Sequence, residues 1–298
     1  MLGGAATAAG SVTLSPGDTR GVGVGVIKCV VAGKTLSRID GCLSIIHSNA
    51  ESIDLSGLRS IEQSLLVEGN ARLRVLRAPQ LRAVEKGELD LAYNGGIGAD
   101  FFVELPAFQK APIGVRIAFN LGGIRLVLSQ LGKGKSSVGT VIIAYNRGLL
   151  TVDLLALSLA PEIFIAGNDQ NVAINMPSLR HVFAGDLAIA SSSALQRVAA
   201  PRLERVHKDL ELFFLASLPS LELPKLVAVE EDAKVHDCAA LMSLALGSLS
   251  AVGEDVELYD CWSLRVVDVS ALTRVEHHQP RWRGSATGGD KLFSRHVK

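Results

Sequence analysis

The stretch that decides the fold is Asp209–Asp232 (DLELFFLASLPSLELPKLVAVEED), because two further copies of its pattern follow it directly. These copies are Ala233–Glu254 (AKVHDCAALMSLALGSLSAVGE) and Asp255–His278 (DVELYDCWSLRVVDVSALTRVEHH). The shared pattern is an aliphatic–x–aliphatic step, two residues, an Asn or Cys slot in most copies, Leu-x-x-Leu, often a Pro, and Leu-x-x-Val. A period in the low twenties is typical of a solenoid of stacked coils.

Outward from these copies, the pattern extends over about Gly41–His278 in roughly ten repeats. An aliphatic residue lies three positions before each slot, from Ile46 and Val67 onward. Successive slots are 21 to 26 residues apart, by subtraction of their positions. The slots are Asn49, Asn70, Asn94, Asn120, Asn146, Asn168, Ser192, Leu215, Cys238 and Cys261.

The aliphatic steps predict short strands whose alternate side chains point into the coil. Stacked coils place such strands side by side as a parallel sheet, about 4.8 Å apart. Inward Asn side chains at one height can pair with backbone groups of neighbouring coils, so we expect a structural ladder rather than a polar site. Pro79, Pro201 and Pro224 share one place in the return segment and predict that it is extended, with little helix. We expect a mainly β, right-handed solenoid of about ten coils with a parallel sheet on one face.

The pattern divides the chain into four parts: a Gly- and Ala-rich leader (1–26), an N-terminal cap (27–40), the solenoid (41–278) and a basic tail (279–298). The first residues lack a basic segment followed by an apolar one, so no secretory signal is predicted. No apolar run approaches the roughly 20 residues that span a bilayer, and membrane insertion is not expected.

Composition narrows the function classes. Lys and Arg (30) balance Asp and Glu (30), which gives no reason to expect a nucleic-acid partner. The chain is 48% hydrophobic but only 5% aromatic, which suits a narrow aliphatic core. No pair of carboxylates is fixed facing a His, and no C-x-x-C motif is present, so we expect neither catalysis nor a metal or other cofactor.

The four cysteines fall into two pairs. Cys238 and Cys261 occupy the slot of adjacent coils, where parallel side chains favour stacked thiols over a disulfide. Cys29 and Cys42 flank the first coil, and the sequence leaves open whether they staple the cap.

The strongest functional signal is the row of residues directly before the slots. It reads Ser48, Gly69, Tyr93, Phe119, Tyr145, Gly167, Ser191, Phe214, Asp237 and Asp260. If the row faces outward, it forms an aromatic stripe followed by an acidic patch, which is a candidate docking surface. The alternative is that the rings pack beneath the turn. The candidate binding residues are Tyr93, Phe119, Tyr145, Phe214, Asp237 and Asp260.

The chain resembles the leucine-rich repeat superfamily, in particular BspA-like repeats and the receptor L-domain. The resemblance lies in the Cys-x-x-Leu steps at Cys238–Leu241 and Cys261–Leu264 and in the return segment Leu223–Val229 (LPKLVAV). The Ala-Phe pair that usually precedes the Cys of BspA-like repeats is missing. The resemblance implies a leucine-rich-repeat-type solenoid at the cell surface or outside the cell, which binds a protein partner and has no catalytic activity. The other hypotheses are a carbohydrate-active β-helix enzyme and a purely structural spacer. The sequence does not set the oligomeric state.

Overall fold

The computed structural model describes residues 6–8, 12–14, 29–31, 36–134, 136–276 and 281–283. The described residues form strands, turns and bends, and none of them is helical. Within these ranges no helix is therefore long and apolar enough to cross a membrane. The chain divides into two compact units, Met1–Asp153 and Leu154–Lys298, and each is a parallel-strand β-solenoid.

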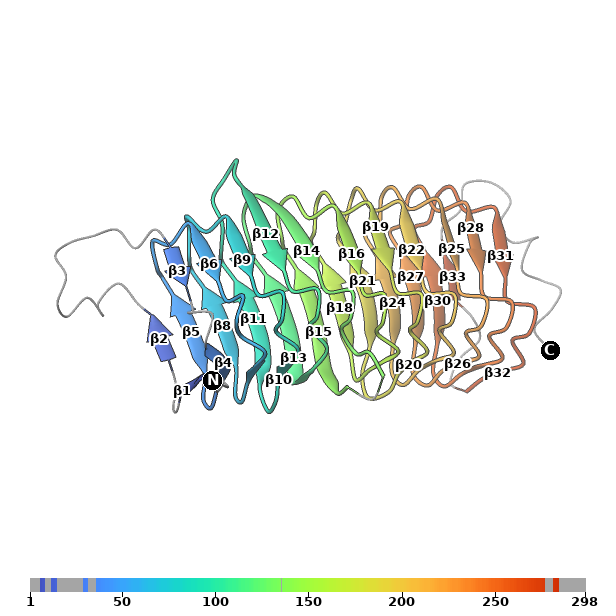
Figure 1. Cartoon of the computed structure of the whole chain (residues 1–298). Coiled ribbons are helices and arrows are strands. Elements are labelled where there is room, and N and C mark those ends of the chain that lie inside the picture. Colours follow the sequence, from blue (N-terminus) through green and yellow to red (C-terminus); the bar gives the residue numbers. More distant parts are fainter. Residues whose placement is uncertain are drawn as a thin grey trace. The chain divides into compact units, whose positions relative to one another are not determined.

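A regular coil of either unit contributes three strands, and most strands pair in parallel with their equivalents in the next coil. We call the sheet that precedes the slot the first sheet and the following two the second and third sheets. Figure 1 shows β5, β8 and β11 of the first unit side by side. The predicted parallel sheet and the extended return segments are therefore confirmed, since the return also forms short strands. About ten turns are present in the chain.

In the first unit the first sheet comprises β2 (Val12–Leu14), β5 (Leu43–Ile46), β8 (Leu65–Glu68), β11 (Glu88–Ala92), β13 (Ala111–Ala118) and β15 (Val138–Ala144). The second-sheet strands are β3 (Cys29–Val31), β6 (Ser52–Asp54), β9 (Val75–Arg77), β12 (Asp100–Glu104), β14 (Gly123–Val127) and β16 (Thr151–Asp153). The third sheet comprises β1 (Ala6–Ala8), β4 (Leu36–Ile39), β7 (Ser60–Ile61) and β10 (Ala83–Val84).

In the second unit the first sheet comprises β18 (Ile163–Ala166), β21 (Leu187–Ala190), β24 (Leu210–Phe213), β27 (Ala233–His236), β30 (Val256–Tyr259) and β33 (Arg281–Arg283). The second-sheet strands are β19 (Ala173–Asn175), β22 (Arg197–Ala199), β25 (Ser220–Glu222), β28 (Ser243–Ala245) and β31 (Val266–Asp268), and the pairing is interrupted between β22 and β25. The third sheet comprises β17 (Leu159–Ala160), β20 (His181–Val182), β23 (Arg205–Val206), β26 (Ala228–Val229), β29 (Ala251–Val252) and β32 (Arg274–Val275).

The core of each unit consists of inward aliphatic rows. In β8 the side chains of Leu65 and Val67 are buried, and those of Leu66 and Glu68 are partly exposed. The same alternation recurs in β24, β27 and β30. Burying one Leu, Val or Ile side chain contributes about 1.5–3 kcal/mol to the hydrophobic free energy of folding. Every coil adds the same rows, so this contribution grows with the number of coils.

The predicted Asn ladder is present. Asn70, Asn94 and Asn120 are each fully buried, and each donates its Nδ2 to the Oδ1 of the next Asn, at 2.9, 3.2 and 2.8 Å. The same Oδ1 atoms accept backbone N–H groups: Asn94 N lies 2.9 Å from Asn120 Oδ1. Each Nδ2 also reaches a strand carbonyl, such as Val67 O at 2.7 Å from Asn94. The ladder satisfies backbone groups at the corner and has no free polar face.

The first coil corrects the predicted register by one residue. Pairing places Ile46 opposite Glu68, so Ser48 is the residue equivalent to Asn70. Ser48 is buried and donates both its backbone N and its Oγ to Asn70 Oδ1, at 2.8 and 2.7 Å. Asn49, which was predicted as the slot, is exposed, and the inward aliphatic is Ile45 rather than Ile46. The prediction was wrong here because two polar residues stand in succession and spacing alone did not separate them.

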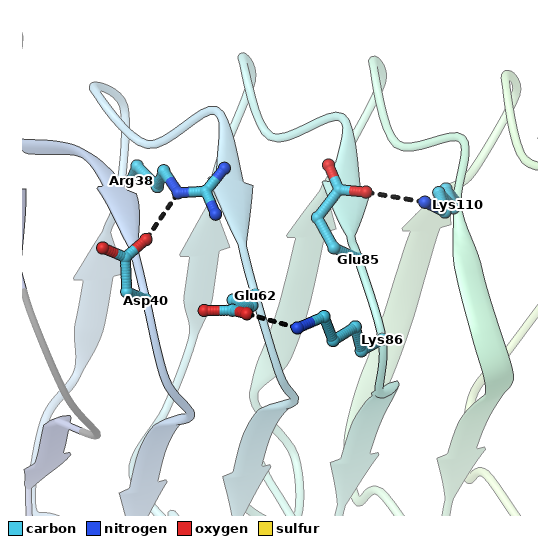
Figure 2. A network of polar contacts seen from close by, with 6 residues as sticks. All are labelled: Arg38, Asp40, Glu62, Glu85, Lys86 and Lys110. Carbon is cyan, nitrogen blue, oxygen red and sulfur yellow. Dashed lines mark hydrogen bonds and ion pairs between the residues drawn. The ribbon is translucent and has the colours of Figure 1, made fainter.

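Ion pairs line the first unit near its third sheet (Figure 2). Lys86 Nζ lies 2.5 Å from Glu62 Oε1, and Lys110 Nζ lies 2.6 Å from Glu85 Oε2. Both pairs join successive coils, while Arg38 pairs with Asp40 in its own coil, at 2.5 Å. Their side chains are 23 to 63% exposed, so solvent and salt screen these pairs and each adds little to stability.

Candidate functional site

The corner before each slot has one backbone conformation. Residues at this corner have φ between 49° and 67°, which is the left-handed region that disfavours side chains. Gly69 and Gly167 meet this requirement at no steric cost. The other corner residues are His47, Tyr93, Phe119, Tyr145, Ser191, Phe214, Asp237 and Asp260. Ser48, which was predicted in this row, is replaced by His47 because of the register correction in the first coil.

In the first unit the rings of Tyr93, Phe119 and Tyr145 form a continuous outward stack, which we call the ring row. Their centroids are 5.0 and 5.1 Å apart and their planes differ by only 4° and 10°. Tyr93 and Tyr145 are 50% exposed and Phe119 is 37% exposed. The rings therefore lie outside the coil and do not pack beneath the turn.

His47 is an addition to this surface that the sequence reasoning missed. It is exposed and has the same corner conformation, one coil before Gly69. A Cβ added to Gly69 would lie 2.2 Å from His47 Nδ1, so the imidazole occupies the space above that glycine. The His-Ser-Asn run at residues 47–49 carried the signal, but only strand pairing identifies His47 as the corner residue.

The other predicted residues, Phe214, Asp237 and Asp260, lie at the equivalent corners of the second unit. Phe214 is 53% exposed, and its ring meets His236 edge-on at 6.0 Å. Asp237 Oδ2 is 2.8 Å from His236 Nδ1. Asp260 is the corner residue one coil further on, partly exposed like Asp237.

A second ring stack, which sequence reasoning also missed, lies beside these corners. Phe213, His236 and Tyr259 are the last residues of β24, β27 and β30, and their centroids are 5.1 and 4.5 Å apart with planes within 8°. All three are partly exposed. An aromatic residue two positions before the slot in three coils that are 23 residues apart was the available signal.

Carboxylates dominate the electrostatics of this part of the second unit. Partial burial raises the pKa of Glu211, and Asp209 and Asp186 add to the effect against the opposing charge of Lys234. Burial, followed by Glu257, Asp237 and Asp260, raises the pKa of Tyr259. In both residues burial is the main cause, and neighbouring carboxylates add to it.

The slot cysteines are thiols, as predicted. Cys238 Sγ lies 3.3 Å from His236 O, and Cys261 Sγ lies 3.4 Å from Tyr259 O. The neighbouring Cys261 and burial together raise the pKa of Cys238, so this thiol is protonated and a poor nucleophile. The side chain of Cys29 lies outside the described residues, so the structure does not test whether Cys29 and Cys42 staple the cap.

In the part of the chain that the structure describes, no group of three or more His, Cys, Asp or Glu side chains is arranged to hold a metal ion. The scan against protein-family models gives no match, and the search of curated proteins gives none either. The structure therefore shows the β-solenoid architecture, and no family match accompanies the resemblance to leucine-rich repeats.

Proposed function

We propose that this protein is a non-catalytic recognition module that binds a protein partner through the outer side of the first sheet, with the ring row as the contact in the first unit. The stacked, exposed row of Tyr93, Phe119 and Tyr145 carries the proposal. Aromatic residues are enriched at the energetic centres of protein interfaces, and only 5% of this chain is aromatic.

Backbone strain at the row supports a functional role. Left-handed φ costs roughly 1–2 kcal/mol for a residue with a side chain, and glycine occupies the same corner in two other coils. Ring stacking returns only about 0.5–1.5 kcal/mol per pair. Folding alone therefore gives little reason for three aromatic side chains at these corners, and strained positions of this kind cluster at binding surfaces.

The ring geometry favours a protein over a carbohydrate. A sugar stacks on the open face of an aromatic ring, but Phe119 has a parallel ring on both of its faces. The middle of the row therefore presents a ring edge between two phenol groups, which suits the packing of apolar and hydrogen-bonding side chains. The proposal also includes the resemblance to BspA-like and receptor L-domain repeats and, with it, a cell-surface or extracellular location.

Affinity capture from extracts of the source organism tests the proposal, with the Y93A/F119A/Y145A variant beside the wild-type chain. A matched control replaces three other exposed apolar residues of the first unit that lie off the first sheet, in the variant I97A/V127A/L150A. We expect a partner that the wild type and the control capture and the ring variant does not, while circular dichroism shows all three folded. Equal capture by both variants, or none by the wild type, would contradict the proposal and favour a structural spacer.

A further inference from the structure

The outer side of β24, β27 and β30 with its corners forms a surface of mixed character, which we call the acidic ring face. It contains the stacked Phe213, His236 and Tyr259 and the exposed Phe214. Around the rings lie carboxylates in three rows: the strand positions Glu211 and Glu257, the corners Asp237 and Asp260, and the residues before the strands, Asp209, Asp232 and Asp255.

The repeat of the coils brings the corner carboxylates close to one another. Asp237 and Asp260 occupy equivalent positions in adjacent coils, and adjacent rungs of a parallel sheet are about 4.8 Å apart. Like charges directly opposite each other on a sheet are destabilising. Asp237 contacts the imidazole of His236, at 2.8 Å between Oδ2 and Nδ1. A cation at this place would therefore be favoured.

Lys234 shows how the face holds a cation. It lies on β27 between Glu211 and Glu257 in the register of the sheet. Its Nζ is 2.6 Å from Asp232 Oδ2, 3.6 Å from Asp209 Oδ2 and 4.0 Å from Glu211 Oε1. An ammonium group thus fits between the carboxylate rows beside the ring stack.

The next strand of the first sheet has basic residues in register with this face. The pairing of β30 with β33 places Arg281 opposite Glu257 and Arg283 opposite Tyr259. Basic residues therefore stand at the two register positions that continue the acidic and the ring rows of the face.

From this charge complementarity we propose that the acidic ring face binds a Lys- or Arg-rich extended segment of a protein partner. The basic side chains pair with Asp237 and Asp260, and their aliphatic stems lie along Phe214 and the edges of the ring stack. The inference rests on the proposed function in that the partner is a protein, but it concerns a surface separate from the ring row.

Fluorescence anisotropy with a labelled alternating Lys-Gly decapeptide tests the inference on the full-length chain. We expect binding that weakens between about 50 and about 300 mM salt and falls about tenfold in the variant D237N/D260N. Asn tolerates the left-handed corner as Asp does, so this variant should keep its fold. A control with the same change of charge on the second sheet, E222Q/D268N, should bind as the wild type does.

Equal binding by D237N/D260N and the wild type would overturn the inference, as would an equal loss in the control. Equal binding of a Ser-Gly decapeptide would also overturn it, because the occupant would then not be selected by charge. The Y93A/F119A/Y145A variant separates this test from the earlier one, since it should bind the Lys-Gly probe normally. If the wild-type chain does not bind the Lys-Gly probe but still captures a partner through the ring row, only the present inference is rejected. If it binds the probe but captures no partner through the ring row, only the proposed function is rejected.

Discussion

At the scale of single residues, the corner before the slot decides which side chains reach the surface. The left-handed backbone at Tyr93, Phe119 and Tyr145 directs each ring away from the coil, where it stacks on its equivalent. The next residue is a buried Asn whose side chain points inward. Two consecutive residues thus have opposite roles, one for recognition in our proposal and one for the ladder.

One buried residue departs from the coil pattern and gives a stability prediction. Asn171 is fully buried where other coils have Leu195, Leu218 and Leu241, and its Nδ2 has no partner among the described residues. N171L should raise the free energy of unfolding by about 1–2 kcal/mol, because removing the unpaired donor outweighs losing the hydrogen bond to Ala173 N at 3.2 Å. Urea denaturation measures the change.

The reverse replacement, L218N, is the matched control, and we expect it to lower the free energy of unfolding by at least about 2 kcal/mol. If N171L is instead less stable than the wild type, the Asn171 amide has a structural role that the coil comparison does not explain.

Lys234 supports a prediction about pH. Partial burial alone lowers the pKa of Lys234, but the hydrogen bond to Asp232 and the charges of Asp209, Asp232 and Glu211 outweigh burial and raise the pKa to about 12. Because the folded-state pKa exceeds the unfolded one, the stabilisation is present below about pH 10.5 and disappears as the pH rises through about 12. K234M should cost about 0.5–1 kcal/mol at pH 8, given the partial exposure of the pair.

Unfolding of wild type and K234M at about pH 8, 10 and 11.5 measures this dependence. The difference between the two proteins should stay constant up to about pH 10 and shrink at the highest pH. A difference that already falls between the two lower values would show that Lys234 does not interact with these carboxylates as described.

At the scale of elements, the Asn ladder couples adjacent coils. Asn94 donates to Val67 O and Asn120 Oδ1, and its own Oδ1 accepts from Asn70. Every member is both donor and acceptor, so removing one leaves buried groups unpaired in two neighbouring coils. The ladder should therefore behave as one unit rather than as a set of separate hydrogen bonds.

A double-mutant cycle tests this behaviour. N94A and N120A should each cost about 2–4 kcal/mol of stability, and the double variant should cost less than their sum by about 0.5–3 kcal/mol. N94A combined with S248A is the control for additivity, because Ser248 Oγ donates to Pro224 O and shares no partner with the ladder. Additive costs for the Asn pair would contradict a coupled ladder.

At the scale of the whole molecule, repetition sets the stability of each unit. A coil contacts mainly its neighbours, so stability is close to a sum of coil and interface terms. Successive coils also exchange equivalent contacts: Asp209 N lies 3.2 Å from Asp186 Oδ1, and Asp232 N and Asp255 N each lie 2.8 Å from the preceding Asp. Coils of the second unit are therefore interchangeable in their pairing.

This interchangeability predicts that one full coil can be deleted. Removing residues 210–232 (232 − 210 + 1 = 23 residues) joins Asp209 directly to Ala233. Asp209 then takes the place that Asp232 has in the full chain. The shortened chain should stay folded with a β-type circular dichroism spectrum and a cooperative melt. Deletion of only residues 210–221 shifts the inward rows out of phase, and it should unfold the second unit. Similar melts for both deletions would contradict a solenoid with this period.

The coil period, the inward rows, the extended returns and the buried Asn ladder could all be predicted from the sequence. Each depends on residue types that recur at a fixed spacing, and burial acts on every coil in the same way. The rings of Tyr93, Phe119 and Tyr145 could be identified as a row, but alternation fails at a corner, so their direction could not. The resemblance to leucine-rich repeats likewise did not reveal three strands in each coil.

The sequence by itself thus determined what repeats and what is buried, because hydrophobic spacing is a property of the chain alone. Tertiary structure alone decided the register of the first coil, the place of His47 above Gly69, and the exposure of both ring stacks. It also brought the carboxylates around Lys234 together from two coils. These features depend on hydrogen bonds to a neighbouring coil and on a left-handed corner, and neither is encoded in the spacing of residues along one coil.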